Sequence, residues 1–526
     1  MLLDVSLLCA IAFFISAILV WMAILLPARG SWIRLPPSPM ALPIIGHLHL
    51  LNTVPYKSFH KLSTHYGPLI QLRLGSVPCI VASSPELAKE LLMKNDLTFS
   101  SRAIPMAVHH LTYKSSGFAF SPFGSQWKFM KKLCMSDLLG GRPLAQLLPI
   151  RRDELHQLVQ LFVNRSDAGE TLNISEELVR LSNNIISRMM LSLRYSGKDD
   201  QAEEARILTR EVTEIFGYFN YSDFIGAFRN FDLQGLFKRS KDTHRRYNIL
   251  LERIINEREE HRGKSKEEMG DGDGVKDFLD VLLDVYEDEK AEVRLTRNHI
   301  KAFVLDIFTA GTDTSAAATE WALSEVINNP IIFERAREEI DMIVGKNSLV
   351  EESDIPNLPY IQAIIKESLR LHPPIPLIGR VASQDCKIAG YDVPAKTSLF
   401  LNVWSMGRDP NNWKDPLEFR PERFMPSQDN EVESMSTVTD VRGQHFNLLP
   451  FGTGRRVCPG ISLAMQQVPT VLAALVQCFD WKVTGHKKDP IMLNMDERPG
   501  LTVPRAHPLI LIPIARSIPF IKTVNL

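Results

Sequence analysis

The sequence lacks an excess of charge of either sign. Its 526 residues carry 60 Lys and Arg against 61 Asp and Glu, which leaves a formal net charge of −1. Proteins that bind nucleic acid usually have a clear basic excess, so no nucleic-acid partner is expected. The chain also lacks a repeat with a period of about 20–50 residues, which excludes solenoids and propellers.

Cysteines are few and scattered. The six lie at positions 9, 79, 134, 386, 458 and 478, without a Cys-x-x-Cys pair, so neither a disulfide framework nor a cysteine-rich zinc site is expected. Five of them are expected to be small buried or membrane hydrophobes in a reducing compartment. Cys458 is different because it lies in FGTGRRVCPG (451–460), between glycines, prolines and arginines.

Charge is absent from a long stretch near the N-terminus. Val5 to Leu26 form an uncharged run of 22 residues, which as a helix spans about 30 Å, the thickness of a bilayer's hydrocarbon core. A cleaved signal peptide would have a shorter apolar run and a basic start. Because Arg29 and Arg34 follow the run, we expect 1–28 to be a single-pass anchor and the bulk of the chain to face the cytosol. Residues 29–46 are expected to form a basic, proline-rich neck, and 47–526 one large domain.

The body of the chain reads as mainly α with a minor β portion, an α+β class. Residues 69–75 and 79–83 resemble short strands, and Ser84-Pro85-Glu86 has the composition of a helix start. The pattern from about 120 to 345 is mostly helical, although the charged, glycine-rich stretch 257–276 is expected to be an exposed loop. Prolines are dense after 373, before a last helical run over 461–479.

One helix carries the sequence AGTDTS (310–315). Thr314 lies on an otherwise apolar face, and Asp313 lies beside it. An acid and an alcohol at this spacing can hand protons to a bound oxygen species. The same residues also fit a threonine that donates to its own i−4 carbonyl and a Gly311 placed for helix packing.

Three further patterns are weak when each is taken alone. Glu367 and Arg370 are three residues apart on one helix face, as in many surface pairs. Arg423 lies among apolar residues in FRPERF, so it needs a carboxylate partner, for which Glu367 is a candidate. Trp127 and Lys131, one helical turn apart, can hold one anionic group or belong to a basic amphipathic helix.

Cys458 is a single thiol without companion ligands, which limits the kinds of metal site that it can form. One cysteine without nearby companion ligands does not make a tetrahedral zinc site, but it can be the axial ligand of a heme iron. Gly454 and Gly460 leave room for a flat macrocycle, and a helix that starts near Gly460 lowers the thiol pKa. Arg456 is within reach of a propionate.

Together these motifs identify a resemblance to the cytochrome P450 family of heme-thiolate monooxygenases. The resemblance covers the anchor, the neck PPSPMALPIIGHLH, WKFMKK, AGTDTS, ESLR, FRPERF and the cysteine loop, all in the family's order. It implies that Cys458 ligates the iron of heme b and that 47–526 is the catalytic domain. It further implies that O2 is a co-substrate and that electrons come from NADPH through a membrane-bound cytochrome P450 reductase. The implied location is the endoplasmic reticulum membrane, with the catalytic domain facing the cytosol.

The resemblance also assigns roles to individual residues. Thr314 and Asp313 match the family's oxygen-activating pair, whereas Glu367, Arg370 and Arg423 match its structural charge triad. The residues at positions that contact the heme propionates are Arg102, Trp127, Lys131, Arg380 and Arg456, with Lys131 standing where arginine is frequent. The residues at substrate-contacting positions are Ile104, Val108, Phe118, Phe120, Phe303, Ala310, Ile375, Leu377, Ile378, Leu501 and Val503.

The substrate is expected to be small, hydrophobic and phenolic. The neck, WSMGRDPNNWKDPLEFRPERF and RPGLTVPRAHP resemble plant microsomal enzymes of flavonoid and isoflavonoid metabolism. Isoflavonoid-forming members tend to carry Ser after the acid and Lys before the strand arginine, where this chain has Thr314 and Gly379. A flavone synthase-like oxidation of a flavanone is therefore favoured over aryl migration.

Other activities stay open. Hydroxylation of a pterocarpan, of another flavonoid or of a triterpenoid also suits apolar and aromatic walls. Heme-thiolate isomerases and dehydratases work without a reductase, but they depart from the acid–Thr pattern and often interrupt the cysteine loop. A heme sensor would need neither Thr314 nor an anchor that faces a reductase.

Overall fold

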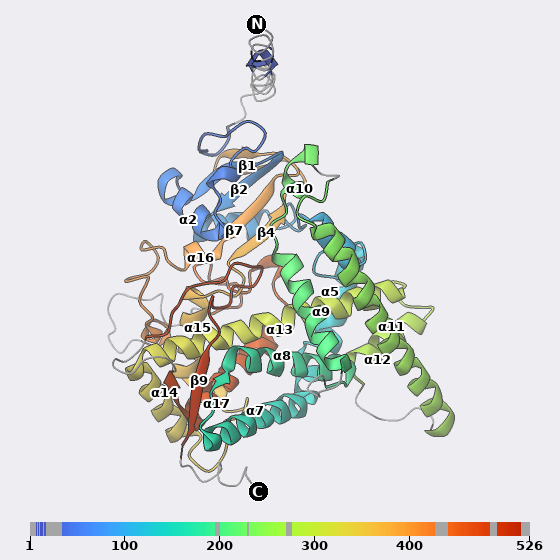
Figure 1. The fold of residues 1–526 in the computed structure, drawn as a ribbon, viewed down its shortest axis with the longest axis vertical. Coiled ribbons are helices and arrows are strands. Elements are labelled where there is room, and N and C mark those ends of the chain that lie inside the picture. The colour runs from blue at the N-terminus through green and yellow to red at the C-terminus, as the bar shows by residue number, and fades with distance from the viewer. Residues whose placement is uncertain are drawn as a thin grey trace. The chain divides into compact units, whose positions relative to one another are not determined.

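The computed structural model describes residues 7, 9, 11–13, 15, 16, 34–194, 200–228, 231–269, 276–426, 440–483 and 492–516. The chain forms two compact units, and Figure 1 shows its ribbon coloured from the N-terminus to the C-terminus. Unit 1 comprises 1–103, 220–234 and 379–402, and unit 2 comprises 104–219, 235–378 and 403–526. Seven residues of the predicted membrane span 5–26 are described (7, 9, 11–13, 15 and 16), and all of them are helical. The rest of the span lies outside the described residues.

Unit 1 is built on a four-stranded sheet with strand order β1-β2-β7-β4. β1 (Leu69–Leu74) and β2 (Val77–Ala82) are antiparallel, and β2 pairs in parallel with β7 (Ser398–Asn402). The division between the units falls inside β4 (Leu377–Val381). Helix α2 (Pro55–Tyr66) contacts β1 and β7. Unit 1 also contains η1 (Leu48–Leu50), α3 (Pro85–Lys89), η2 (Glu90–Lys94), α10 (Tyr221–Phe224), η3 (Gly226–Phe228) and the hairpin β5 (Cys386–Ile388)–β6 (Tyr391–Val393).

The two predicted strands and the helix start of this unit are confirmed. The predicted stretch 69–75 contains β1, and 79–83 overlaps β2, which begins two residues earlier at Val77. The side chain of Ser84 accepts a hydrogen bond from the Leu87 backbone N–H at 3.4 Å. Pro85 occupies the first turn of α3, where its missing N–H costs nothing.

Unit 2 is mainly helical. Its helices are α4 (Met106–Leu111), α5 (Ser125–Asp137), α6 (Gly141–Gln146), α7 (Leu148–Ala168), α8 (Ile174–Leu191), α9 (Asp200–Gly217), α11 (Leu236–Met269), α12 (Phe278–Glu287), α13 (Arg297–Asn328), α14 (Pro330–Ile343), η4 (Ile355–Asn357), α15 (Pro359–Leu371), α16 (Val403–Met406), η5 (Pro421–Phe424), η6 (Gly454–Arg456) and α17 (Ile461–Cys478). A small sheet has the order β3 (Leu172–Asn173), β9 (Ile510–Ala515), β8 (Phe479–Val483). The prediction of a mainly α chain with a minor β portion is confirmed.

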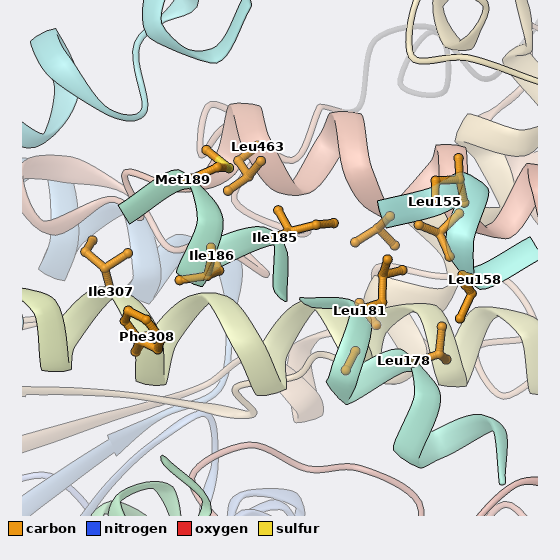
Figure 2. Packing of buried hydrophobic residues seen from close by; sticks show 14 of the residues in the cluster. Leu155, Leu158, Leu178, Leu181, Ile185, Ile186, Met189, Ile307, Phe308 and Leu463 are labelled. Carbon is orange, nitrogen blue, oxygen red and sulfur yellow. The ribbon is translucent and has the colours of Figure 1, made fainter. Parts of the chain in front are cut away.

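Helix α13 is the axis of unit 2. It starts at a capping box in which Thr296 and His299 satisfy each other's backbone N–H groups. It then packs against α8, α15 and α17. Figure 2 shows α8 between α13 and α17, with Ile186 facing Ile307 and Phe308 of α13, and Met189 close to Leu463 of α17.

Gly311 of α13 has a packing role. A Cβ at this position would lie 2.6 Å from Cδ1 of Ile186, so the missing side chain lets α8 approach α13 closely. α13 is continuously helical from Arg297 to Asn328. The structure therefore supports the packing explanation for this glycine rather than a local distortion of the helix.

Helix α17 is the one described helix that is long and apolar enough to cross a membrane, and 72% of it is buried inside the fold. It contacts α13, α14 and α15, which identifies it as a core helix.

The prediction of a loop over 257–276 is wrong for most of that stretch. α11 continues to Met269, and ion pairs with its neighbours stabilise the charged face. Arg297 of α13 contacts Glu259 at 2.8 Å, and Arg258 contacts Asp277 at 2.6 Å. The sequence alone did not reveal these partners, because they come from elsewhere in the chain.

Candidate functional site

The cysteine loop of unit 2 closes on itself by a backbone hydrogen bond. The Cys458 N–H donates to the Phe451 carbonyl at 3.0 Å, across a turn in which Gly452 and Gly454 have φ of +69° and +74°. These left-handed values suit glycine. Gly460 caps α17, and a Cβ there would lie 3.7 Å from the Cys458 Sγ. The sulfur therefore lies at the N-terminus of an 18-residue helix, where the dipole and free N–H groups favour a thiolate.

Two cations surround Trp127 of α5. The Arg456 guanidinium lies 4.5 Å and the Lys131 ammonium 5.3 Å from its ring centroid. Arg456 donates to the carbonyls of Phe118 (3.2 Å) and Ser121 (2.5 Å), and Lys131 donates to the Arg455 carbonyl at 2.7 Å. The structure thus brings the predicted residues Trp127, Lys131 and Arg456 together beside the cysteine loop.

These residues fit a group that carries carboxylates. The buried Trp127 Nε1 has no hydrogen-bond partner among the described residues, although an indole N–H is strictly a donor. A buried donor without an acceptor is costly, and two cations beside it favour an anion as that acceptor. A heme with its propionates, held through the thiolate of Cys458, satisfies this donor set.

Arg102 and Arg380 belong to unit 1. The Val381 N–H donates to the Ser101 carbonyl at 3.0 Å, forming an antiparallel bridge that brings the backbone of Arg102 next to that of Arg380. Arg380 is buried, and its Nη1 donates to the Gly379 carbonyl at 2.8 Å. Their predicted contact with heme propionates stays a prediction.

The acid–alcohol pair lies in the middle of α13. The Thr314 hydroxyl donates to the Ala310 carbonyl at 2.6 Å, as do several other hydroxyls of this helix to their own i−4 carbonyls. The Asp313 carboxyl lies near the side chain of Thr213 of α9, whose hydroxyl favours the ionised carboxylate. Desolvation raises the pKa of Asp313, against the lowering effect of Thr213 and Arg498. The carboxyl therefore holds a proton at higher pH than an ordinary aspartate.

The charge triad is fully assembled. Glu367 accepts from Arg370 Nε at 2.6 Å and Nη2 at 2.7 Å, and from Arg423 Nε at 2.9 Å. The side chains of Glu367 and Arg370 are completely buried. The remaining guanidinium donors reach backbone carbonyls of 407–418. The expected pairing of Arg423 with Glu367 is present, and the Glu367–Arg370 pair lies in the interior rather than on the surface.

The predicted substrate residues differ in exposure. Phe303 is completely buried and lies against Phe118 and Phe278, with ring centroids 5.6 and 5.1 Å away. Val503 is buried, and its carbonyl accepts from the Trp321 indole at 2.8 Å. Val108 and Ile378 are also buried, Ala310 is exposed, and Ile104, Phe118, Phe120, Ile375, Leu377 and Leu501 are half-buried.

Asp306 of α13 is not among the residues that the sequence motifs pointed to. Its Oδ2 accepts from the backbone N–H groups of Phe118 (2.6 Å) and Ala119 (2.9 Å), and the residue is buried. The sequence did contain a signal for this residue, since Asp306 is the one charge in the apolar run FVLDIF. A carboxylate buried in such a run needs hydrogen-bond partners.

Three of the other five cysteines are buried, as expected, whereas Cys386 is half-buried. Cys79, Cys134 and Cys478 are buried free thiols. Burial raises the pKa of Cys134 to about 12, and the nearby Cys458 sulfur adds to the increase. Cys134 is therefore a neutral thiol close to the cysteine loop.

The chain is similar to known proteins over most of its length. The family model described as Cytochrome P450 matches residues 36–511. The chain is 54% identical to cytochrome P450 93B16 of Glycine max, with 92% of each chain covered. It is 50% identical to 3,9-dihydroxypterocarpan 6A-monooxygenase of Glycine max (98% of this chain, 99% of that one) and 44% identical to 2-hydroxyisoflavanone synthase of Glycyrrhiza echinata (97% of each).

A solved zebrafish cytochrome P450 with progesterone resembles the structure with a TM-score of 0.73 at 25% identity, covering 88% of this chain and 100% of that one. The predicted P450 fold, oxidoreductase class and heme-thiolate cofactor are thereby confirmed. The chain belongs to the cytochrome P450 family, with plant monooxygenases among its relatives.

Proposed function

We propose that this enzyme oxidises a flavanone to the corresponding flavone, using O2 and electrons that a reductase delivers from NADPH. The observation that carries the proposal is the aromatic wall beside the cysteine loop. Half-buried Phe118 stacks on Phe303 at 24°, and Phe120 meets the edge of Phe216 at 5.1 Å. Flat aryl rings are favoured by such a wall, because offset and edge-to-face aromatic contacts add to area burial.

The roles of the polar residues follow from their positions. Cys458 would hold the heme through its thiolate, and the heme would supply the activation of O2. Trp127, Lys131 and Arg456 are proposed to bind its propionates, as are Arg102 and Arg380 of unit 1. Asp313, whose pKa is raised, directly precedes Thr314 in α13, so this pair is proposed to hold and pass on the protons that the reduction of O2 would need.

Two positions at which the chain differs from isoflavonoid-forming enzymes favour oxidation of a flavanone over formation of an isoflavonoid. It carries Thr314 and Gly379 where those enzymes tend to have Ser and Lys. The second candidate is hydroxylation of a pterocarpan, which is favoured by the 50% identity to 3,9-dihydroxypterocarpan 6A-monooxygenase.

The proposed location is the endoplasmic reticulum membrane. Residues 1–28 would be the anchor, 29–46 the neck, and 47–526 the cytosolic catalytic domain that meets the reductase. The basic residues Lys128, Lys132 and Arg455 of this enzyme are proposed to contact an acidic surface of the reductase.

Microsomes that contain the full-length enzyme and a plant reductase test the proposal. They are incubated with flavanones, pterocarpans, isoflavanones and a triterpene, each with and without NADPH, and products are identified by mass. NADPH-dependent loss of two hydrogens from a flavanone is expected. Consumption of another class with flavanones untouched would refute the substrate, and product formed without NADPH or reductase would refute the monooxygenase mechanism.

A further inference from the structure

A short segment, 117–121, is held from two sides in unit 2. On one side the Asp306 carboxylate of α13 accepts from two consecutive backbone N–H groups, those of Phe118 and Ala119. On the other side Arg456 of the cysteine loop donates to the carbonyls of Phe118 and Ser121. The Phe118 residue therefore links a buried carboxylate to a buried guanidinium through its own backbone.

The approach of Asp306 to this segment depends on Gly117. A Cβ at 117 would lie 2.1 Å from the Asp306 Oδ2 and 2.9 Å from the Ala302 carbonyl of the same helix. No side chain fits at that separation, so the glycine and the carboxylate are matched to each other.

The chain that leads into the segment is strained. Tyr113, Lys114 and Ser115 have φ of 52°, 60° and 61°, three consecutive non-glycine residues in the left-handed region. This region is unfavourable for L-residues with a Cβ and persists only where the surroundings hold it. Two hydrogen bonds to a buried carboxylate are strong restraints of the required kind.

We propose that Asp306 is a positioning residue that fixes segment 117–121. By doing so it places Phe118 and Phe120 in the substrate wall and orients Arg456 toward the heme propionate. The substrate part of this inference rests on the proposed function, whereas the effect on the segment and on Arg456 does not.

The test uses full-length holoenzyme and the variants Asp306→Asn and Asp306→Ala. Hydrogen exchange at the Phe118 and Ala119 amides should accelerate by about tenfold or more, because charge-assisted hydrogen bonds to these amides are lost. Heme transfer to an acceptor protein should also accelerate, and the spectral dissociation constant for a flavanone should rise. Asp306→Asn should show smaller changes than Asp306→Ala, since it keeps a carbonyl acceptor. Gly117→Ala should also accelerate exchange at the Phe118 and Ala119 amides, because the added Cβ pushes the segment away from Asp306.

Glu320→Gln is the matched control. Glu320 is a buried carboxyl on the same helix, but it accepts from Ser175 Oγ at 2.5 Å and does not contact the segment. It should leave exchange at 118 and 119 and heme transfer at the wild-type rates. Wild-type exchange and heme transfer in Asp306→Ala would overturn the proposal. If the variants do not fold, fast exchange of these two amides in the wild-type enzyme would overturn it as well. Failure of the wild-type enzyme to bind any flavanone would refute the proposed substrate alone.

Discussion

Glu367→Gln should strongly destabilise the enzyme. Glu367 is completely buried and accepts from Arg370, Arg423 and the Arg420 backbone N–H, which lies 2.8 Å from its Oε1. Glutamine keeps the shape of the side chain, but it removes the only negative charge of the triad and replaces one acceptor oxygen by a donor. Two guanidinium groups then lie in the interior without a carboxylate.

The expected loss follows from the burial of the pair. Removing one partner of a buried ion pair typically costs about 3–5 kcal/mol, because the remaining charge stays desolvated. Total stability of a folded domain is about 5–15 kcal/mol, so the substitution removes a large fraction of it. Glu367→Asp should destabilise as well, since its shorter side chain keeps the charge but does not reach both arginines.

The assay is urea unfolding of the full-length protein, followed by fluorescence, together with the yield of heme-containing enzyme. The matched control is Glu170→Gln, which breaks a pair with Arg165 whose side chains are 51% and 45% exposed. Exposed pairs contribute about 0–1 kcal/mol, so the control should unfold close to the wild-type urea concentration. Equal unfolding midpoints for the two variants would refute the reasoning.

Three further outcomes are expected. Cys458→Ala should lose the absorption band typical of thiolate-bound heme in the reduced, carbon monoxide-bound enzyme, whereas Cys134→Ala should keep it; retention of the band by the first variant would exclude Cys458 as the ligand. Asp313→Asn should lower turnover by about 100-fold or more, and it should remove the loss of activity as pH rises through the raised pKa of the carboxyl; an unchanged pH profile would contradict its role as a proton donor. Burial lowers the pKa of His372, so the unfolded state binds the extra proton and stability should fall as pH drops below the ordinary value of about 6.5. His372→Phe should flatten this acid dependence in urea unfolding while keeping the stack on Trp321, which lies 4.1 Å away, and an undiminished acid dependence would assign it to another group.

Local signals in the sequence predicted those parts of the fold that depend on neighbouring residues. Ser84 before Pro85 predicted the start of α3, and the apolar run from 461 predicted α17, because capping and periodicity act within a few residues. The cysteine loop was recognisable for the same reason, since its glycines and Cys458 lie within ten residues.

Contacts between distant residues were harder to predict. The helical state of 257–269 depends on partners such as Arg297, which is 38 positions away from Glu259. The role of Asp306 depends on backbone groups that lie 187 and 188 positions away. A backbone N–H carries no sequence signature, so a carboxylate that binds one is visible in the sequence only as an isolated charge.

The raised pKa of Cys134 has a consequence for the lifetime of the enzyme. With a pKa of about 12, only about one thiol in 10⁵ is ionised at pH 7. Oxidants and electrophiles attack the thiolate rather than the thiol, so this sulfur is a poor target for the reactive oxygen species that leak from uncoupled turnover. Cys134 thus stays a neutral thiol in the neighbourhood of Cys458, the sulfur that is expected to ligate the iron. Burial of Cys134 should therefore make it slow to oxidise during turnover.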